Sequence, residues 1–332
     1  MSNWIRVVAC AAFLALPMLE ARAADYTLRL NHTLPATHLR ERDAELFKGM
    51  VEKATGGRVE VQIFPAGQLY KSDQDAIKAV RSGAIEGAMV TTGDLALFVP
   101  AFNLYEAPFV ITSYAQLDAL LDSPVAAEIL AKLEPLGIKG LVHTDAGSAI
   151  LASRPHPIST PGDLRGLRVR AAAGRVQVRA LELLGASAIQ LPVADIGPAL
   201  ERGTVEGVLS TPSALAEMQI GSLVPYGTVT NQQFFPPVVI VNLAWWNGLP
   251  PEVRQQVSGT LKSFEQQARE ANLKEEERAF GSLASQGVKV VKLDAAALDA
   301  FKSKLQPLHE EIRQQIGPAL YDEALRVVQS AH

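Results

Sequence analysis

The stretch VRSGAIEGAMVT (residues 80–91) recurs without a gap as LERGTVEGVLST (residues 200–211), and this internal repeat indicates the fold. Each copy has the end of a helical pattern, a glycine suited to a left-handed helix cap, a Glu-Gly pair, a short apolar run and then hydroxyl residues. Two copies that lie far apart in the chain predict two similar lobes rather than a solenoid. Chance similarity is the alternative, because helix-glycine-strand junctions are common in α/β proteins.

The segments around the first copy alternate between strand and helix patterns. Apolar and polar residues alternate over 26–31 and 58–64, which predicts two strands, and helical patterns cover 37–55 and 73–82. Glycines follow both helices, at Gly56-Gly57 and at Gly83. This order is typical of an α/β fold.

A long amphipathic pattern follows Pro250-Pro251 and continues to about Ser285, which predicts one helix long enough to cross both lobes. A strand over 288–293 and two helical patterns separated by Gly317-Pro318 complete the chain. We therefore expect a two-lobed α/β protein. The expected parts are a first lobe of 24–147 with a crossing segment of about 237–250, a second lobe of 148–236 with the C-terminal segment of about 287–332, and a connecting helix of 251–286.

The first 23 residues, MSNWIRVVACAAFLALPMLEARA, have the pattern of a secretory signal peptide. Arg6 precedes an apolar stretch, and Ala21-Arg22-Ala23 is a small-x-small cleavage pattern. This predicts cleavage after Ala23 and an exported protein. A membrane anchor is a weaker alternative, because the apolar stretch is shorter than the roughly 20 residues that a spanning helix needs. A lipid attached at Cys10 is weaker still.

The composition excludes several function classes. The chain has 332 residues, 48% of them hydrophobic, and a formal net charge of -4, which argues against a nucleic-acid partner. Its six histidines are scattered and Cys10 is the only cysteine, so we expect no metal site and no cofactor. No nucleotide-binding or nucleophile motif is present, and Ser148 near His143 is better read as a loop serine than as part of a triad.

Candidate ligand-binding residues lie where predicted strands end. Thr91 ends the first copy of the repeat and Thr92 follows it, and Ser210 and Thr211 end the second copy. Arg170 ends the strand pattern LRGLRVR (164–170), where its guanidinium could bind a carboxylate, and a solvated arginine is the equally weighted alternative. Asp73 lies at a helix start and is more often an N-cap than a ligand contact.

These residues resemble a known family, the periplasmic solute receptors of tripartite ATP-independent (TRAP) transporters. The resemblance covers nearly the whole chain after the signal peptide. Nine motifs in order carry it: FPAGQL (64–69), AVRSGAIE (79–86), FVP (98–100), APF (107–109), DLRGLRVR (163–170), LGA (184–186), GTVEG (203–207), TN (230–231) and WNGLP (246–250).

The resemblance implies two lobes that close on a small organic acid, which is then delivered to the small and large membrane subunits of a permease. It implies a location in the periplasm and no enzymatic activity, and it implies that Arg170 forms a salt bridge with the ligand carboxylate. The other positions that it implies for the ligand site are Asn31, His32, Thr33, Asp73, Thr91, Thr92, Ser210, Thr211 and Asn231. Phe234 is a further candidate ligand contact because of its apolar side chain.

The chain also departs from the family pattern. Thr230-Asn231 is followed by Gln232 where many members have histidine, and the apolar Ile150 stands near the position of a second arginine in sialic-acid receptors, which argues against sialic acid. Ile150 and Phe234-Phe235 suggest an acid with an apolar part. A ligand-presenting receptor for a membrane sensor and a secreted enzyme are the alternative functions. The identity of the acid, an accompanying metal ion and the oligomeric state stay open.

Overall fold

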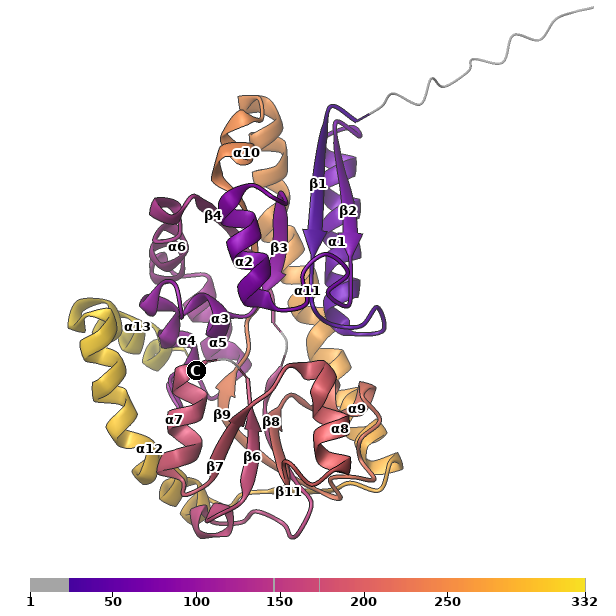
Figure 1. Cartoon of the computed structure of the whole chain (residues 1–332). Helices are drawn as coiled ribbons and strands as arrows, with labels where there is room; N and C mark the ends of the chain where they lie inside the picture. Colours follow the sequence, from indigo (N-terminus) through magenta and orange to yellow (C-terminus); the bar gives the residue numbers. More distant parts are fainter. Residues whose placement is uncertain (1–23, 146, 173, 332) are drawn as a thin grey trace, which may run out of the picture.

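In the computed structural model, residues 24–145, 147–172 and 174–331 are described. They form two β-sheets that occupy separate halves of the molecule (Figure 1). Sheet A has the order β2-β1-β3-β10-β4, with β1 (Tyr26–Asn31), β2 (Val59–Phe64), β3 (Gly87–Val90), β4 (Ile138–His143) and β10 (Val238–Asn242). Sheet B has the order β11-β9-β5-β8-β6-β7, with β5 (Ser148–Ser153), β6 (Arg168–Ala171), β7 (Ser187–Gln190), β8 (Gly207–Ser210), β9 (Tyr226–Phe234) and β11 (Lys289–Lys292).

The two sheets share one strand pattern. In sheet A, β2, β1 and β3 are parallel and β10 is antiparallel to β3. In sheet B, β7, β6 and β8 are parallel and β5 is antiparallel to β8. The prediction of two similar α/β lobes is therefore confirmed, and we call the half with sheet A lobe I and the half with sheet B lobe II.

Two short connections cross between the sheets. The chain leaves sheet A after β4 and enters sheet B as β5, and it returns from β9 to sheet A as β10. The antiparallel strands β5 and β10 are thus the first strands after these two connections. Because both connections are short, they hold the two lobes close together.

Helices cover the sheets on both sides (Figure 1). The helices before the first crossing are α1 (Leu39–Ala54), α2 (Asp73–Ser82), α3 (Thr92–Leu95), α4 (Asn103–Glu106), α5 (Tyr114–Leu121) and α6 (Pro124–Ala131). The later ones are α7 (Arg175–Leu183), α8 (Ile196–Glu201), α9 (Pro212–Glu217), α10 (Leu243–Gly248), α11 (Pro251–Ser285), α12 (Ala295–Ile316) and α13 (Pro318–Ser330). Short 3₁₀ helices occur at Pro100–Phe102, Glu134–Leu136, Pro161–Leu164 and Val193–Asp195.

The helix α11 has 35 residues and contacts both lobes, as the amphipathic pattern predicted. On lobe I it packs against α1, where the rings of Phe264 and Phe47 meet edge-on at 5.4 Å. On lobe II it packs against α9, and its buried Ala279 and Leu283 join the hydrophobic core under sheet B. One helix therefore contributes to two cores.

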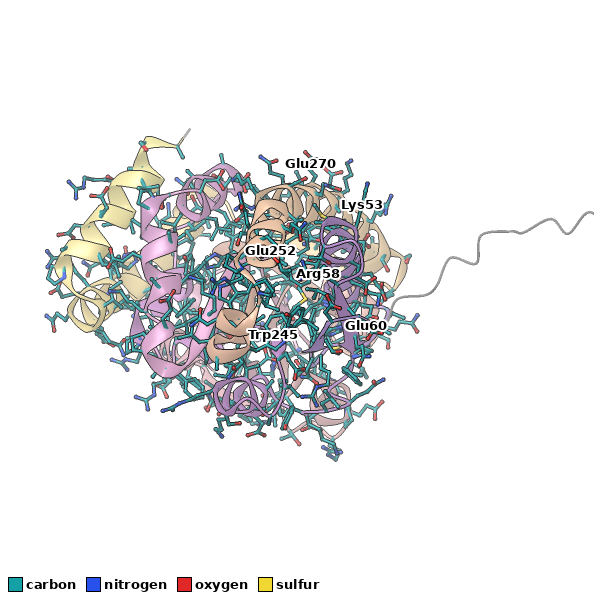
Figure 2. The ribbon with its side chains drawn as sticks, turned by 90° about the horizontal axis from the view of Figure 1, so that it is seen from above. Lys53, Arg58, Glu60, Trp245, Glu252 and Glu270 are labelled. Atoms are coloured by element: carbon teal, nitrogen blue, oxygen red, sulfur yellow. The ribbon has the colours of Figure 1, made fainter. Side chains whose placement is uncertain are left out.

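The start of α11 is also tied to lobe I by charge. Arg58, just before β2, donates from Nη1 to Glu252 Oε1 at 3.2 Å and from Nε to Asp25 Oδ2 at 3.0 Å. Figure 2 shows Arg58 beside Glu252 on the face seen from above. The pair is exposed, so its contribution to stability is small.

The C-terminal segment divides between the lobes. β11 pairs with β9 in sheet B, whereas α13 contacts α5 and α6, which belong to lobe I. α12 contacts both α7 and α4. The segment 287–332, expected in lobe II, thus packs on both lobes because the apolar face of α13, which includes the buried Tyr321 and Ala324, covers lobe I. The other expected boundaries stay predictions, and the signal peptide lies outside the described residues.

Candidate functional site

Both copies of the sequence repeat fold in the same way. Gly83 and Gly203 have positive φ angles of 77° and 70° after α2 and α8, as left-handed caps require. At the other end of each strand, a threonine caps the next helix: Thr91 Oγ1 accepts from Asp94 N at 3.2 Å, and Thr211 Oγ1 accepts from Ala214 N at 3.3 Å. The hydroxyls of Thr91 and Thr211 are therefore occupied in part by capping.

Arg170 lies in β6 with its side chain almost fully buried. Its side chain donates to two backbone carbonyls, from Nε to Leu191 O at 3.0 Å and from Nη1 to Leu209 O at 3.4 Å. Burial lowers the pKa of Arg170 to about 10, and the charge of Asp94 acts in the opposite direction. Among the described residues, no carboxylate forms an ion pair with this guanidinium. The two carbonyls hold the side chain in place, and its charge stays without a direct partner.

The strand register gives Arg170 a counterpart in lobe I. Arg170 pairs with Val208 of β8, and Asn31 pairs with Ala88 of β3 at the equivalent position. Asn31 also holds the loop after the neighbouring strand, because its side-chain amide exchanges hydrogen bonds with the backbone of Tyr70 at 3.2 and 3.3 Å. Asn31 is fully buried, so its role here is to fix the loop that leads to α2.

Asp73 joins two other predicted site residues of lobe I, Thr33 and Thr91. Its Oδ1 accepts from Thr33 Oγ1 at 2.7 Å, and its Oδ2 accepts from Thr91 N at 2.9 Å. Arg40 lies 3.7 Å from the same Oδ2. The N-cap of α2 is Ser72, whose hydroxyl accepts from Asp75 N, and not Asp73. Asp73 is thus free of capping and orders the ends of β1 and β3.

His32 is fully buried and contacts Glu41, with Nε2 2.6 Å from Oε2. Burial and the charge of Arg40 lower its pKa to about 4, so the ring is neutral near pH 7. His32 therefore supports the start of α1, and no contact among the described residues links it to Arg170.

Three further predicted residues of lobe II differ in their surroundings. Ser210 ends β8 half-buried, and Asn231 has a positive φ of 45° in β9 with a buried Oδ1 that accepts no hydrogen bond from the described residues. Phe234 is buried against Tyr114, with ring centroids 5.1 Å apart in an edge-on pair. Phe234 is thus a core residue, and Ile150 likewise lies in the core under sheet B. Their apolar character gives no information about the ligand.

Thr92 contacts the buried carboxylate of Glu106, which the sequence analysis did not identify as a candidate. Its hydroxyl donates to Glu106 Oε1 at 2.8 Å, and Glu106 Oε2 accepts from Gln177 of lobe II at 3.3 Å and from Gln233 of β9. Burial raises the pKa of Glu106 to about 7, and the three donors lower it. Glu106 therefore connects lobe I with lobe II through hydrogen bonds.

Asp94 is the second charged residue that sequence reasoning missed. Its carboxylate accepts from Thr91 Oγ1 at 2.7 Å. Burial, followed by the charge of Asp73, raises its pKa to about 6. The sequence Thr91-Thr92-Gly93-Asp94 has the spacing of a capping box, which was a usable signal for this pair.

A second contact between the lobes joins α1 and α9. His38 caps α1, since its Nδ1 accepts from Arg40 N at 3.0 Å, and its Nε2 lies 3.8 Å from Glu217 Oε2 at the end of α9. Burial, followed by the charge of Glu275, raises the pKa of Glu217 to about 7, and the backbone N–H of Leu39 acts in the opposite direction. The carboxylate of Glu217 thus sits at the N-terminus of α1, where the helix dipole favours negative charge.

The described residues lack a metal-binding cluster and a membrane-spanning helix. They contain no group of three or more His, Cys, Asp and Glu side chains that could hold a metal ion. In the same part of the chain, each helix is too short or too polar to cross a membrane.

Comparisons with known proteins agree on the family. Residues 30–315 match the model of bacterial extracellular solute-binding protein family 7. A C4-dicarboxylate-binding periplasmic protein of Rhodobacter capsulatus is 28% identical over 94% of this chain and 93% of its own length. A sugar acid binding protein of Advenella mimigardefordensis in complex with galactonate superposes with a TM-score of 0.88, at 24% identity over 94% of this chain and 100% of that one.

A third similar structure is a TRAP periplasmic solute-binding protein of a Sulfitobacter species with bound β-D-galacturonate. It has a TM-score of 0.84 and 25% identity over 92% of this chain and all of that one. Since the family model covers most of the chain, the resemblance inferred from the nine motifs is confirmed. The family is one of transport receptors and not of enzymes. The chain belongs to bacterial extracellular solute-binding protein family 7, the periplasmic solute-binding proteins of TRAP transporters.

Proposed function

We propose that this protein captures a small organic acid between its lobes and that Arg170 binds the ligand carboxylate. The observation that carries this proposal is the buried Arg170 guanidinium, held by two carbonyls and without an ion pair among the described residues. A buried charge without a counterion is costly, so a carboxylate that reaches it gains a strong, charge-assisted contact. The relatives named above are described as binding dicarboxylates or sugar acids, which supports an acid as the ligand.

Around Arg170, the other binding residues that we propose are Thr91, Thr92 and Asp73 from lobe I and Ser210, Thr211 and Asn231 from lobe II. The buried Asn231 Oδ1, which has no donor among the described residues, is available to a ligand hydroxyl or N–H. We propose that Asn31, His32, Thr33 and Phe234 support these residues from behind, through their contacts with Tyr70, Glu41, Asp73 and Tyr114.

The loaded receptor then delivers its ligand to the small and large membrane subunits of a TRAP permease. Family membership supports this partner, and the sequence of residues 1–23 supports export with cleavage after Ala23. Mass determination of the protein isolated from the periplasm tests the cleavage site, since the chain should begin at Ala24.

Thermal unfolding in the presence of paired ligands tests the binding proposal. Each pair consists of an acid and its primary amide, taken from monocarboxylates, hydroxy acids and dicarboxylates, and the protein is first refolded to remove carried-over ligand. An acid at 100 times its dissociation constant should add about 2.7 kcal/mol of stability, whereas its amide should add almost none. Equal stabilisation by an acid and its amide would contradict the assignment of Arg170.

A further inference from the structure

Four charged side chains gather where the two lobes meet. Arg40, Asp73 and Asp94 come from lobe I, and Arg170 comes from lobe II. Both arginines are over nine-tenths buried, and Arg40 Nε has no hydrogen-bond partner among the described residues. Arg40 lies against Asp73, so its charge is already matched by a carboxylate.

Asp94 belongs to a segment of lobe I that contacts lobe II just after β6. Gly93, which directly precedes it, packs against Gly174 of lobe II, where a Cβ atom would lie 3.5 Å from the Gly93 Cα. Gly174 follows β6 and hence lies close to Arg170 along the chain. The charge of Asp94 acts on Arg170, but the two side chains do not form a direct ion pair among the described contacts.

The acceptor positions of the two acids differ in how far they are filled. Asp73 receives Thr33 Oγ1 and Thr91 N and contacts Arg40. Asp94 accepts from Thr91 Oγ1 and from the Gln74 side chain but has no arginine in contact among the described residues, and a carboxylate can accept about four hydrogen bonds. Asp94 is only half-buried, so it retains acceptor positions that a ligand could reach.

A ligand whose carboxylate binds Arg170 brings the rest of its chain toward Asp94. There a hydroxyl group donates a hydrogen bond, whereas a second carboxylate meets a like charge and an arginine that is already paired. We propose that Asp94 is a specificity-determining residue that selects hydroxylated monocarboxylates over dicarboxylates of the same length. This inference rests on the proposed role of Arg170.

Calorimetric titration with two four-carbon acids tests the inference. The ligands are 2,3,4-trihydroxybutyrate and succinate, and the proteins are the wild type, Asp94→Asn and the control Asp75→Asn, which changes an exposed acid of the same lobe. The wild type should bind trihydroxybutyrate at least about tenfold more tightly than succinate. Asp94→Asn should reduce this ratio at least tenfold, and Asp75→Asn should leave it unchanged.

Each contrary result would overturn a different part of this inference. If succinate binds the wild type as tightly as trihydroxybutyrate, the selectivity assigned to Asp94 is wrong, whether or not the variant folds. If Asp94→Asn changes both affinities by the same factor, Asp94 does not determine specificity. If neither acid binds more weakly to Arg170→Ala than to the wild type, the proposed function fails and this inference fails with it.

Discussion

Gln177 donates a hydrogen bond across the two lobes to Glu106, with Nε2 3.3 Å from Oε2. Glu106 ends α4 in lobe I, and Gln177 lies in the first turns of α7 in lobe II. The same carboxylate also accepts from Thr92, which follows the strand that ends at the proposed ligand site. A single buried acid thus links the position of α7, and of β6 before it, to lobe I.

The acid at position 106 makes the stability depend on pH. Because burial raises its folded-state pKa from 4.5 to about 7, the native state holds the proton more tightly than the unfolded chain does. The contribution to stability is therefore fully present below the unfolded pKa and is lost as the pH rises through about 7. Glu106→Gln removes this titration. The unfolding free energy of the variant should therefore rise, relative to that of the wild type, by up to about 3 kcal/mol between about pH 5 and pH 8.

Urea unfolding of both proteins at several pH values measures this difference. The readout is the change of the unfolding free energy with pH, and not its absolute value. Lys78→Met, on the exposed face of α2, serves as a control that should leave the pH slope as in the wild type. A wild type and a Glu106→Gln variant with parallel pH profiles would show that Glu106 has no raised pKa.

Gly207, in the repeat, is required by a close approach of two strands. A Cβ atom on Gly207 would lie 2.9 Å from the backbone oxygen of Ala152 in β5, and that backbone is held by pairing on both sides. Gly207→Ala should cost about 1 to 3 kcal/mol of unfolding free energy. Gly259→Ala, inside α11 with nothing within 4 Å, should instead add up to about 1 kcal/mol. Equal effects of the two substitutions would refute the steric argument.

The cap of α9 gives a separate prediction. Thr211→Ala removes the hydroxyl that accepts from Ala214 N and should destabilise the protein by about 1 kcal/mol, whereas Thr211→Ser retains the acceptor and should be close to neutral. Thermal unfolding of both variants distinguishes them. If the serine variant loses as much stability as the alanine variant, the threonine methyl group and not the cap carries the effect.

Local patterns predicted the elements well because their causes are local. The period of apolar residues and the glycines at 56–57, 83 and 287 placed the ends of α1, α2 and α11 within a few residues. The repeat predicted equivalent strand ends because the same sequence has the same capping needs in both lobes.

The parts that were missed depend on contacts distant in sequence. Glu106 receives its donors from positions 92, 177 and 233, and no spacing rule brings these together. Likewise, the apolar type of Phe234 and Ile150 did not reveal that both lie in a core. The docking of α13 on lobe I depends on tertiary packing. The sequence shows that this helix has an amphipathic face, but it does not indicate which surface that face covers.

The most direct test of the account is the affinity of Arg170→Ala for the acid that stabilises the wild type most. Arg168→Ala is the matched control, since Arg168 lies two residues earlier on β6 and is exposed beside Glu206. Loss of a buried charged contact should cost about 2 to 5 kcal/mol, so we predict that Arg170→Ala binds at least about 30-fold more weakly and that Arg168→Ala binds as the wild type does. An affinity of folded Arg170→Ala within about twofold of the wild type would contradict the central claim.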